Sequence, residues 1–243
     1  SGRCLLSNYF TNRDANRGVC AQDCRWNYKV VAQDHESAGA HDIIEDLNGT
    51  YIFNAKDLCT IEFIDEIIKS GVDSLKIEGR MKSIYYNSIV TKQYREAIDK
   101  FYTGNYKFDE KWLYELQTIS HRLYSKGFFF GKTSEEDQNY NTSVSYSQTY
   151  QLVANVLEKL EKNSYKIYIR NKIIASEVEL ELIRPNHDPI KFKVDKFLNL
   201  KNNEYTDTVN PNTIAVIKTD IEMEEMDLIR VKLPVGYSDT DID

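Results

Sequence analysis

The sequence predicts an α/β region followed by an all-β domain, and three observations lead to this fold class. Apolar residues recur at helical spacing in the first half of the chain and flank a short run that alternates like a strand. Strand-like runs separated by turn residues follow one another after residue 150. The 243 residues are 41% hydrophobic and 28% charged with only 4 Pro, so a disordered or collagen-like chain is excluded.

The first half of the chain has the element order of a (β/α) barrel. Asp73–Glu78 alternates between polar and apolar residues like a short strand, and a helix is predicted on either side of it. Asn54 is a suitable N-cap for the first of these helices. The predicted helices are Ala55–Ser70, Ser83–Tyr102 and Asp109–Ser125. Functional groups of such barrels lie at the carboxyl ends of strands, where Lys76, Glu78 and Arg80 are found.

The second half of the chain predicts a small antiparallel β-barrel. Short strands at close spacing, with turn residues between them, are typical of such domains. The predicted strands are Leu152–Leu160, Tyr165–Arg170, Glu177–Arg184, Ile190–Phe197, Thr213–Lys218 and Asp227–Leu233. Residues 132–148 are polar and predict a linker, whereas residues 1–50 have weak periodicity and are expected to be loop-like and functional.

The net charge of −7 is unevenly distributed along the chain. Residues 219–243 hold eight acidic against two basic residues, while residues 76–107 hold seven basic against three acidic residues. The first half can therefore meet an anionic partner, although ordinary solvated surfaces would have the same composition. No apolar run approaches the roughly 18 residues that span a membrane, so we expect a cytoplasmic chain without a membrane partner.

All four cysteines, Cys4, Cys20, Cys24 and Cys59, lie in the first quarter of the chain. Clustered cysteines in a cytosolic chain of this size more often serve metal or redox chemistry than disulfides. Cys20 and Cys24 could supply a close pair of thiolate ligands, with Cys4 and Cys59 contributed by elements on either side. An iron–sulfur cluster, a zinc site, buried free thiols and a disulfide all stay open from spacing alone.

Common catalytic signatures are absent from the sequence. His35 and Glu36 begin a zinc-protease motif, but glycine stands where the second histidine is required. There is no Gly-x-Ser-x-Gly motif, and the run 127–133 is one residue short of a phosphate-binding loop. Arg13 and Arg17 lie four residues apart in a polar stretch, which suits either carboxylate or phosphate binding or a plain solvated loop.

Several blocks of the sequence share the pattern of one known family. These blocks are Ser1–Tyr9, Arg13–Gly18, Cys20–Gln22, Cys24–Trp26, Glu45–Asp46, Gly49–Asn54, Lys56–Cys59, Ser74–Ser83, Ser120–Arg122 and Gly127–Gly131. Together they resemble the collagenase-like peptidase family U-32, and the resemblance covers essentially the whole chain. The β-rich second half is similar to the small barrel domain that many members of this family append.

The resemblance implies the C-terminal portion of a (β/α) TIM-like barrel, followed by the small antiparallel β-barrel. A complete (β/α) barrel takes about 250 residues, so its N-terminal half would lie outside this sequence or come from a partner chain. The expected ranges are 1–131 for the partial barrel, 132–148 for the linker, 149–236 for the β-barrel and 237–243 for an acidic tail.

Some members of the family assemble a 4Fe–4S cluster, and the resemblance implies the same cofactor here. Cys4, Cys20 and Cys59 match ligand positions of those members. The fourth ligand would be Cys24 or a cysteine upstream of this chain. One departure from the family pattern is Asp23, which stands where many members have proline.

The functional implication is divided, because the family was named for proteolysis while other members hydroxylate RNA. The expected function is 5-hydroxylation of the tRNA wobble uridine with prephenate as co-substrate, which makes the full-length protein an enzyme with tRNA or another RNA as partner. The alternatives are a collagenase-like peptidase, with or without a metal, and a non-catalytic binding or scaffold fragment that docks a protein partner. The residues expected to meet the substrate are Arg13, Arg17, Arg25, Lys76, Glu78 and Arg80.

Overall fold

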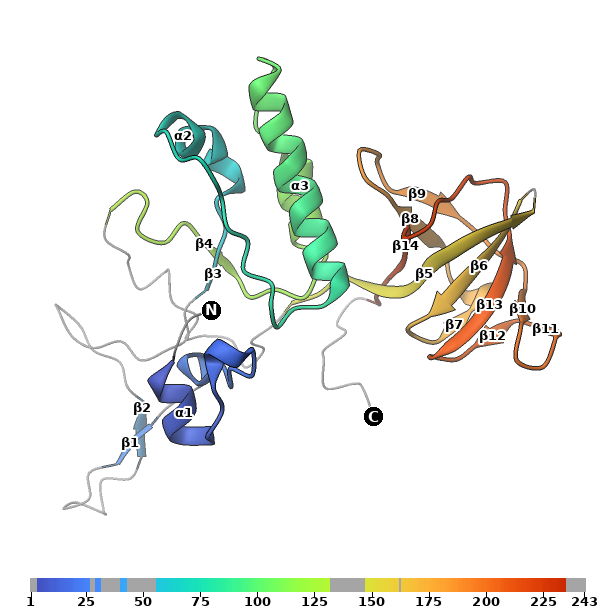
Figure 1. The fold of residues 1–243 in the computed structure, drawn as a ribbon, viewed down its shortest axis with the longest axis horizontal. Coiled ribbons are helices and arrows are strands. Elements are labelled where there is room, and N and C mark those ends of the chain that lie inside the picture. Colours follow the sequence, from blue (N-terminus) through green and yellow to red (C-terminus); the bar gives the residue numbers. More distant parts are fainter. Residues whose placement is uncertain are drawn as a thin grey trace. The chain divides into compact units, whose positions relative to one another are not determined.

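Residues 4–26, 29–31, 40–42, 56–131, 147–161 and 163–234 are described by a computed structural model, drawn in Figure 1. Contacts divide the chain into two units. The thiol unit comprises Ser1–Thr60, Asp73–Ser83 and Arg122–Ser145, and the sheet unit comprises Ile61–Val72, Ile84–His121 and Tyr146–Asp243. This division differs from the sequence-based ranges 1–131 and 149–236, which stay a prediction.

Short elements joined by turns make up the thiol unit. They are α1 (Leu5–Thr11), β1 (Lys29–Val31), β2 (Ala40–Asp42), β3 (Asp57–Leu58) and β4 (Tyr124–Ser125), with 3-10 turns at Ala15–Arg17 and Asp23–Arg25. β1 pairs antiparallel with β2, and β3 pairs in parallel with β4. The loop expected over residues 1–50 therefore contains a helix, which begins where Cys4 caps its first turn.

The strand predicted at Asp73–Glu78 is wrong. All six of its side chains are exposed, and it pairs with no strand in the described parts of the chain. Alternation alone does not hold a strand in place without a partner and a core face. The parallel pair of β3 and β4 spans two residues of each strand, and the larger (β/α) barrel stays a prediction.

The sheet unit contributes the helices α2 (Ile64–Lys69), α3 (Ile84–Tyr102) and α4 (Glu110–Leu116), with a 3-10 turn at Ile61–Phe63 before α2. The helix predicted at Ser83–Tyr102 is confirmed by α3. The predictions Ala55–Ser70 and Asp109–Ser125 are too long, because Asp57–Leu58 and Tyr124–Ser125 pair with each other as strands. Asn54, the predicted N-cap, lies outside the described residues.

One eight-stranded antiparallel sheet fills the rest of the sheet unit, with its strands coloured yellow to red in Figure 1. Its strands are β5 (Tyr150–Glu161), β6 (Ser164–Ile169), β8 (Leu180–Ile183), β9 (Ile190–Phe192), β10 (Phe197–Asn199), β11 (Glu204–Thr206), β13 (Thr213–Lys218) and β14 (Leu228–Lys232). A separate pair joins β7 (Ile173–Ile174) to β12 (Thr208–Val209), and a 3-10 turn covers Ala175–Glu177.

The small domain is an open sheet, and the predicted closed β-barrel is wrong. The strand order is β11-β10-β13-β6-β5-β14-β8-β9, so β9 and β11 lie at opposite edges and each pairs on one side only. Both edge strands have three residues, and the chain after β11 pairs with β7 instead of with β9. Strand spacing in the sequence predicts the strands but does not specify whether their ends meet.

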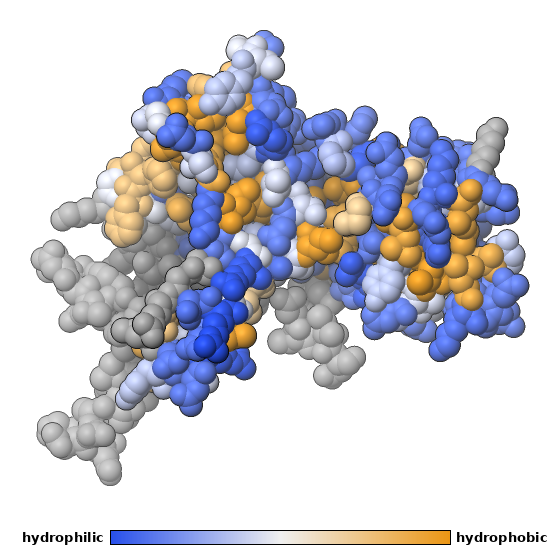
Figure 2. Space-filling model, in the orientation of Figure 1, coloured by the Kyte–Doolittle hydropathy of each residue, from blue (hydrophilic) through white to orange (hydrophobic). Residues whose placement is uncertain are grey.

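Alternating burial along the strands builds the core of the sheet unit. In β6, Tyr165, Ile167 and Ile169 are buried while the residues between them are partly exposed. The core also contains Val153, Val156, Leu182, Phe197, Ile217 and Ile229. Figure 2 shows hydrophobic and hydrophilic residues interspersed over the strands, as expected where every second side chain faces inward.

A buried ionic network joins the helices to the sheet inside this unit. Arg230 of β14 is 1% exposed, and its guanidinium binds Glu115 of α4 through two bonds of 2.7 and 3.0 Å. It also donates to Glu181 of β8 at 2.9 Å, to the hydroxyl of Tyr85 at 3.1 Å and to Thr118 at 3.2 Å. The strand β8 and the helices α3 and α4 are therefore all bonded to one cation of β14.

The surroundings of Arg230 favour its charged form. Burial opposes the charge, but the hydrogen bonds to Glu115 and Tyr85 and the negative charge of Glu115 outweigh burial and raise the pKa of Arg230. Burial likewise raises the pKa of Tyr85, which therefore stays a neutral donor or acceptor. The ring of Tyr150 lies 4.2 Å from the guanidinium carbon of Arg230 and completes its enclosure through a cation–π contact.

Candidate functional site

All residues that the sequence nominates for the site fall in the thiol unit. The cysteines lie at the start of α1, in the segment 20–24 and directly after β3, while the basic residues lie in 13–25 and 76–80. The segment 76–80 is far from α1 in sequence, yet contacts place it in the same unit. This grouping is what a shared site requires, although it does not by itself place the side chains against each other.

The sulfur atoms of Cys4 and Cys20 each accept a hydrogen bond from a nearby backbone amide. Cys4 is the N-cap of α1, and its Sγ accepts a hydrogen bond from the amide of Ser7 at 3.5 Å. Cys20 Sγ accepts from the amide of Gln22 at 3.4 Å. Each sulfur therefore has one backbone amide donor within its own turn.

Ser7 connects these two thiol segments and was not among the residues expected from the sequence. Its side chain is buried, and its Oγ accepts from the amide of Ala21 at 3.0 Å. Since its own amide donates to Cys4, Ser7 links the cap of α1 to the residue that follows Cys20. A serine three residues after an N-cap is the sequence signal for this arrangement, but the long-range bond to Ala21 has none.

The other two cysteines differ in accessibility. Cys24 is exposed in the turn Asp23–Arg25, whereas Cys59 is 7% exposed and its amide donates to the carbonyl of Ser125 at 3.0 Å. Within the described residues no three His, Cys, Asp or Glu side chains are gathered closely enough to hold a metal ion. The thiol chemistry thus fits an iron–sulfur cluster, but the placement of these thiols does not supply three ligands.

Arg80 joins the segment 73–83 to the polar loop after α1. Its Nη1 donates to the carbonyl of Asn16 at 3.3 Å, and its amide donates to Glu78 at 3.1 Å. Gly18 has φ of +85°, and a Cβ there would lie 2.7 Å from Nε of Arg80. Glycine is required at this point both for the left-handed backbone and for the approach of the guanidinium.

Three of the remaining basic residues, Arg13, Arg17 and Lys76, are accessible. Arg13 and Lys76 are exposed, and the side chain of Arg25 lies outside the described residues. The Arg17 side chain is 78% exposed and pairs with Asp14 at 3.6 Å, while Asp14 also accepts from Asn8 at 2.8 Å. Exposed pairs of this kind are weak, so Arg17 can exchange Asp14 for another anion.

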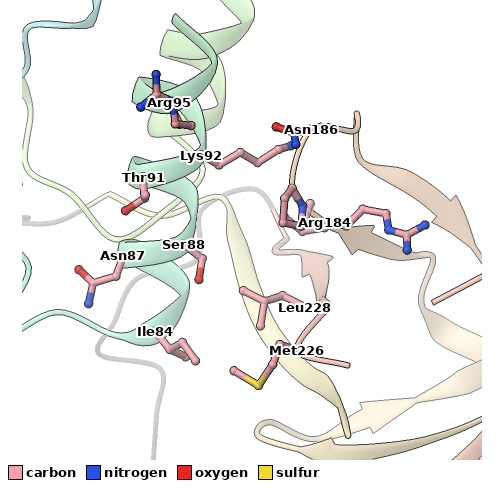
Figure 3. A pocket seen from close by; sticks show the side chains of 12 residues that line it. Ile84, Asn87, Ser88, Thr91, Lys92, Arg95, Arg184, Asn186, Met226 and Leu228 are labelled. Atoms are coloured by element: carbon pink, nitrogen blue, oxygen red, sulfur yellow. The ribbon is translucent and has the colours of Figure 1, made fainter. Parts of the chain in front are cut away.

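The sheet unit contains a cavity that the sequence did not predict (Figure 3). Its volume is about 680 Å³. Helix α3 contributes Ile84, Asn87, Ser88, Thr91, Lys92 and Arg95 to its wall. The sheet side contributes Ile183, Arg184, Pro185, Asn186, Met226 and Leu228. The polar residues at spacings of three and four along α3 were a possible sequence signal for this wall.

Burial lowers the pKa of Lys92, because desolvation penalises its charged form. Its Nζ donates to the carbonyl of His187 at 2.6 Å. The nearby Asp188 pairs with Lys111, and Lys92 has no ion-pair partner among the residues that the structure describes. Two of its three donor positions are therefore left for a ligand or water.

Comparison with family models gives the affiliation of the chain. A model described as Peptidase family U32 matches residues 1–139, and one described as Peptidase family U32 C-terminal domain matches residues 148–230. The chain belongs to peptidase family U32. The sequence resemblance is thereby confirmed, and the second match covers the strands from β5 into β14.

Family relatives of this U32 chain carry two kinds of name. The tRNA hydroxylation protein P of Haemophilus influenzae is 33% identical over 244 residues, covering 83% of this chain and 52% of that protein. The tRNA hydroxylation protein P1 of Bacillus subtilis is 32% identical over 232 residues, covering 95% and 54%. A collagenase of Porphyromonas gingivalis is 35% identical over 153 residues, covering 62% and 40%.

This U32 chain spans about half the length of the tRNA hydroxylation proteins that it matches. None of the helices in the described ranges combines the length and the apolar composition that crossing a bilayer demands.

Proposed function

We propose that the protein to which this chain belongs hydroxylates tRNA at C5 of the wobble uridine, with prephenate as co-substrate. The observation that carries this proposal is the similarity to tRNA hydroxylation proteins, 32% to 33% identical over 83% to 95% of this chain. Since the chain spans about half of those proteins, the activity is assigned to the full-length protein. The thiol unit is then the closing part of its (β/α) barrel.

The exposed cations of the thiol unit support an anionic substrate. Arg13 and Lys76 are exposed, and the exposed pair of Arg17 with Asp14 is easily exchanged. Guanidinium groups bind the phosphates of RNA and the carboxylates of a prephenate-like acid through paired hydrogen bonds. The proposed substrate-binding residues are Arg13, Arg17, Arg25, Lys76, Glu78 and Arg80.

The proposed cofactor is a 4Fe–4S cluster held by Cys4, Cys20 and Cys59, with Cys24 or a cysteine outside this chain as the fourth ligand. Its support is the amide donors on the sulfurs of Cys4 and Cys20, since such bonds tune cluster potentials. A cluster supplies one-electron chemistry when bound. Gathering three thiols requires rearrangement of the segments described here or the rest of the full-length protein.

Mass spectrometry of tRNA nucleosides from a gene-deletion strain tests the proposed function. We expect 5-hydroxyuridine to disappear and to return with the wild-type gene. Arg13→Gln should fail to restore it, because Arg13 is exposed and its removal disturbs no described contact. Lys201→Gln is the matched control, since it removes an exposed cation from the turn between β10 and β11 in the sheet unit. Unchanged 5-hydroxyuridine in the deletion strain would contradict the proposal.

Anaerobic purification of the full-length protein tests the cofactor separately. We expect bound iron and a broad absorption in the visible range, both lost on Cys20→Ser substitution. A colourless, iron-free wild-type protein would contradict the cluster while leaving RNA hydroxylation open.

A peptidase is the second candidate, and the Porphyromonas gingivalis collagenase, 35% identical over 62% of this chain, favours it. Peptide cleavage that persists through purification and disappears with Arg13→Gln would support this activity. Cleavage that does not change with the variant, together with loss of 5-hydroxyuridine in the deletion strain, would exclude it in favour of tRNA hydroxylation.

A further inference from the structure

The cavity beside α3 is a second candidate site, and the proposed function does not use it. Its wall contains three cationic side chains and no carboxylate. The cavity lies entirely within the sheet unit, so its shape does not depend on how the two units are placed. A volume of about 680 Å³ falls within the range of small-ligand pockets, roughly 300–1,000 Å³.

Lys92 is the cation that reaches across this cavity. Figure 3 shows its side chain extending from α3 toward the turn that carries Asn186. Partial burial destabilises its charged form and lowers its pKa, even though the negative charge of Glu115 acts in the opposite direction. An anion placed beside Nζ would reverse that penalty and use the donors that His187 leaves unoccupied.

The two arginines of the wall play unequal parts. Arg184 is held by Glu224 at 3.0 Å and by Asp227 at 3.4 Å, and its guanidinium turns away from α3 in Figure 3. Arg95 pairs with Asp99 one turn along α3, with both side chains more than half exposed. In Figure 3 the guanidinium of Arg95 lies on the side of α3 away from Asn186, so Lys92 is the cation of the wall that faces the sheet side.

An apolar wall lies opposite the polar face of α3. Leu228 is buried, while Met226 is 62% exposed and holds φ of +72°, a left-handed conformation that a non-glycine residue adopts at a cost of roughly 1–2 kcal/mol. In Figure 3 both side chains lie beside Ile84 and Ser88. A strained backbone that presents an exposed methionine to a cavity is a pattern found at ligand sites.

We propose that this cavity binds one nucleotide of a tRNA strand, with its phosphate at Nζ of Lys92 and its sugar and base against Met226 and Leu228. The inference rests on the proposed function for its choice of RNA. The permanent charge of a phosphodiester matches the cationic end, and the flat sugar–base surface matches the apolar end. Ser88 lies between the two ends and offers a hydroxyl to the ribose.

Binding of total tRNA to this 243-residue chain, measured by fluorescence anisotropy over a series of salt concentrations, tests the inference. Lys92→Gln should weaken binding about fivefold to tenfold. It should also reduce the slope of log Kd against log salt by about one. Lys218→Gln is the matched control, because it removes an exposed cation from β13, three strands from β14 in the sheet. Equal effects of the two variants, or no effect of Lys92→Gln, would overturn the site.

Met226→Gly separates binding from folding. It relieves the left-handed strain and removes the side chain, so thermal stability should hold or rise while tRNA affinity falls about threefold with an unchanged salt slope.

Uridine monophosphate that binds tightly, while tRNA affinity is insensitive to Lys92→Gln, would mean a small-molecule pocket and would overturn the inference. Failure here with loss of 5-hydroxyuridine in the deletion strain leaves the proposed function intact. If the variants weaken tRNA binding as expected but the deletion strain retains 5-hydroxyuridine, only the proposed hydroxylation of tRNA is contradicted.

Discussion

Arg230 of the sheet unit and Arg80 of the thiol unit differ in burial and in the partners of their guanidinium groups. In the sheet unit, Arg230 is 1% exposed and bonds to Glu115 and Glu181 from two other elements. In the thiol unit, Arg80 is exposed, donates to a backbone carbonyl of Asn16 and lies against the bare backbone of Gly18. Electrostatic interactions gain strength when water is excluded, so the contacts of the first arginine stabilise the structure more than those of the second.

The same contrast extends to packing. The sheet unit has a continuous core of alternating strand residues, whereas the described part of the thiol unit depends on caps and single long-range bonds such as Ser7 to Ala21. Binding residues often lie on loops held by few contacts, because a packed core leaves no room for a ligand. We therefore expect substitutions in the sheet unit to change stability most and those in the thiol unit to change local opening.

Arg230→Met is expected to have the largest effect. It leaves Glu115 and Glu181 buried without their cation, which costs about 3–5 kcal/mol. Trp112 is fully buried in the same unit, so its fluorescence in a Trp26→Phe background reports unfolding in urea. Arg95→Met, which removes an exposed ion pair, should change the free energy of unfolding by less than about 0.5 kcal/mol.

Replacing the network as a whole should restore most of this loss. The triple variant Arg230→Met, Glu115→Leu, Glu181→Leu removes all three charges together, and such replacements are often neutral or stabilising. A triple variant as unstable as Arg230→Met alone would show that packing of the guanidinium, including its contact with Tyr150, matters more than its charge.

Gly18→Ala should have an intermediate effect, confined to the thiol unit. Alanine at φ of +85° costs roughly 1–2 kcal/mol, and its Cβ would push the guanidinium of Arg80 away from Asn16. All four cysteines lie in this unit, so the rate at which a thiol reagent labels the buried Cys59 reports its opening. We expect labelling to accelerate about fivefold to tenfold.

Gly131→Ala is the matched control for this prediction. Gly131 has φ of +125° but nothing within 4 Å of the added Cβ, so it carries the backbone strain without the clash. It lies in the same unit as the four cysteines, so labelling of Cys59 reports its effect as well. Equal acceleration by both variants would show that the Arg80 contact does not hold the thiol unit together.

Sequence patterns predicted well those elements that carry their own periodicity. The helix Ser83–Tyr102 and the strand Thr213–Lys218 coincide with α3 and β13. Helix α3 buries residues at spacings of three and four, and β13 buries an apolar run at its centre. Asp73–Glu78 alternates as clearly, but it is exposed and pairs with nothing in the described chain. The sequence also did not predict whether the sheet closes. Closure would require β9 and β11 to pair with each other, and such long-range pairing has no local sequence signal.

The candidate sites divide along the same line. The cysteines and arginines were visible as residue types at close spacing, and contacts group them in one unit. Ser7 and the α3 cavity had only a partial sequence signal, because both depend on bonds or walls formed by segments distant in sequence. Lys92 and Met226 lie 134 positions apart in the numbering and share a cavity only after the sheet has formed beside α3.

Lys92→Met should have a small effect on stability, and its sign distinguishes a binding residue from a structural one. Because burial lowers the pKa of Lys92, the unfolded chain binds more protons, and stability rises with pH between the folded pKa and the unfolded value near 10.4. Methionine removes this dependence, so the free energy of unfolding should rise by less than about 1 kcal/mol at neutral pH and become flatter toward about pH 10. Denaturation in urea at several pH values measures the free energy of unfolding and its dependence on pH.

A variant that gains stability while losing tRNA affinity would mean that Lys92 is retained for binding at the expense of stability. A variant that loses stability would instead make its bond to His187 a structural contact, like those of Arg230.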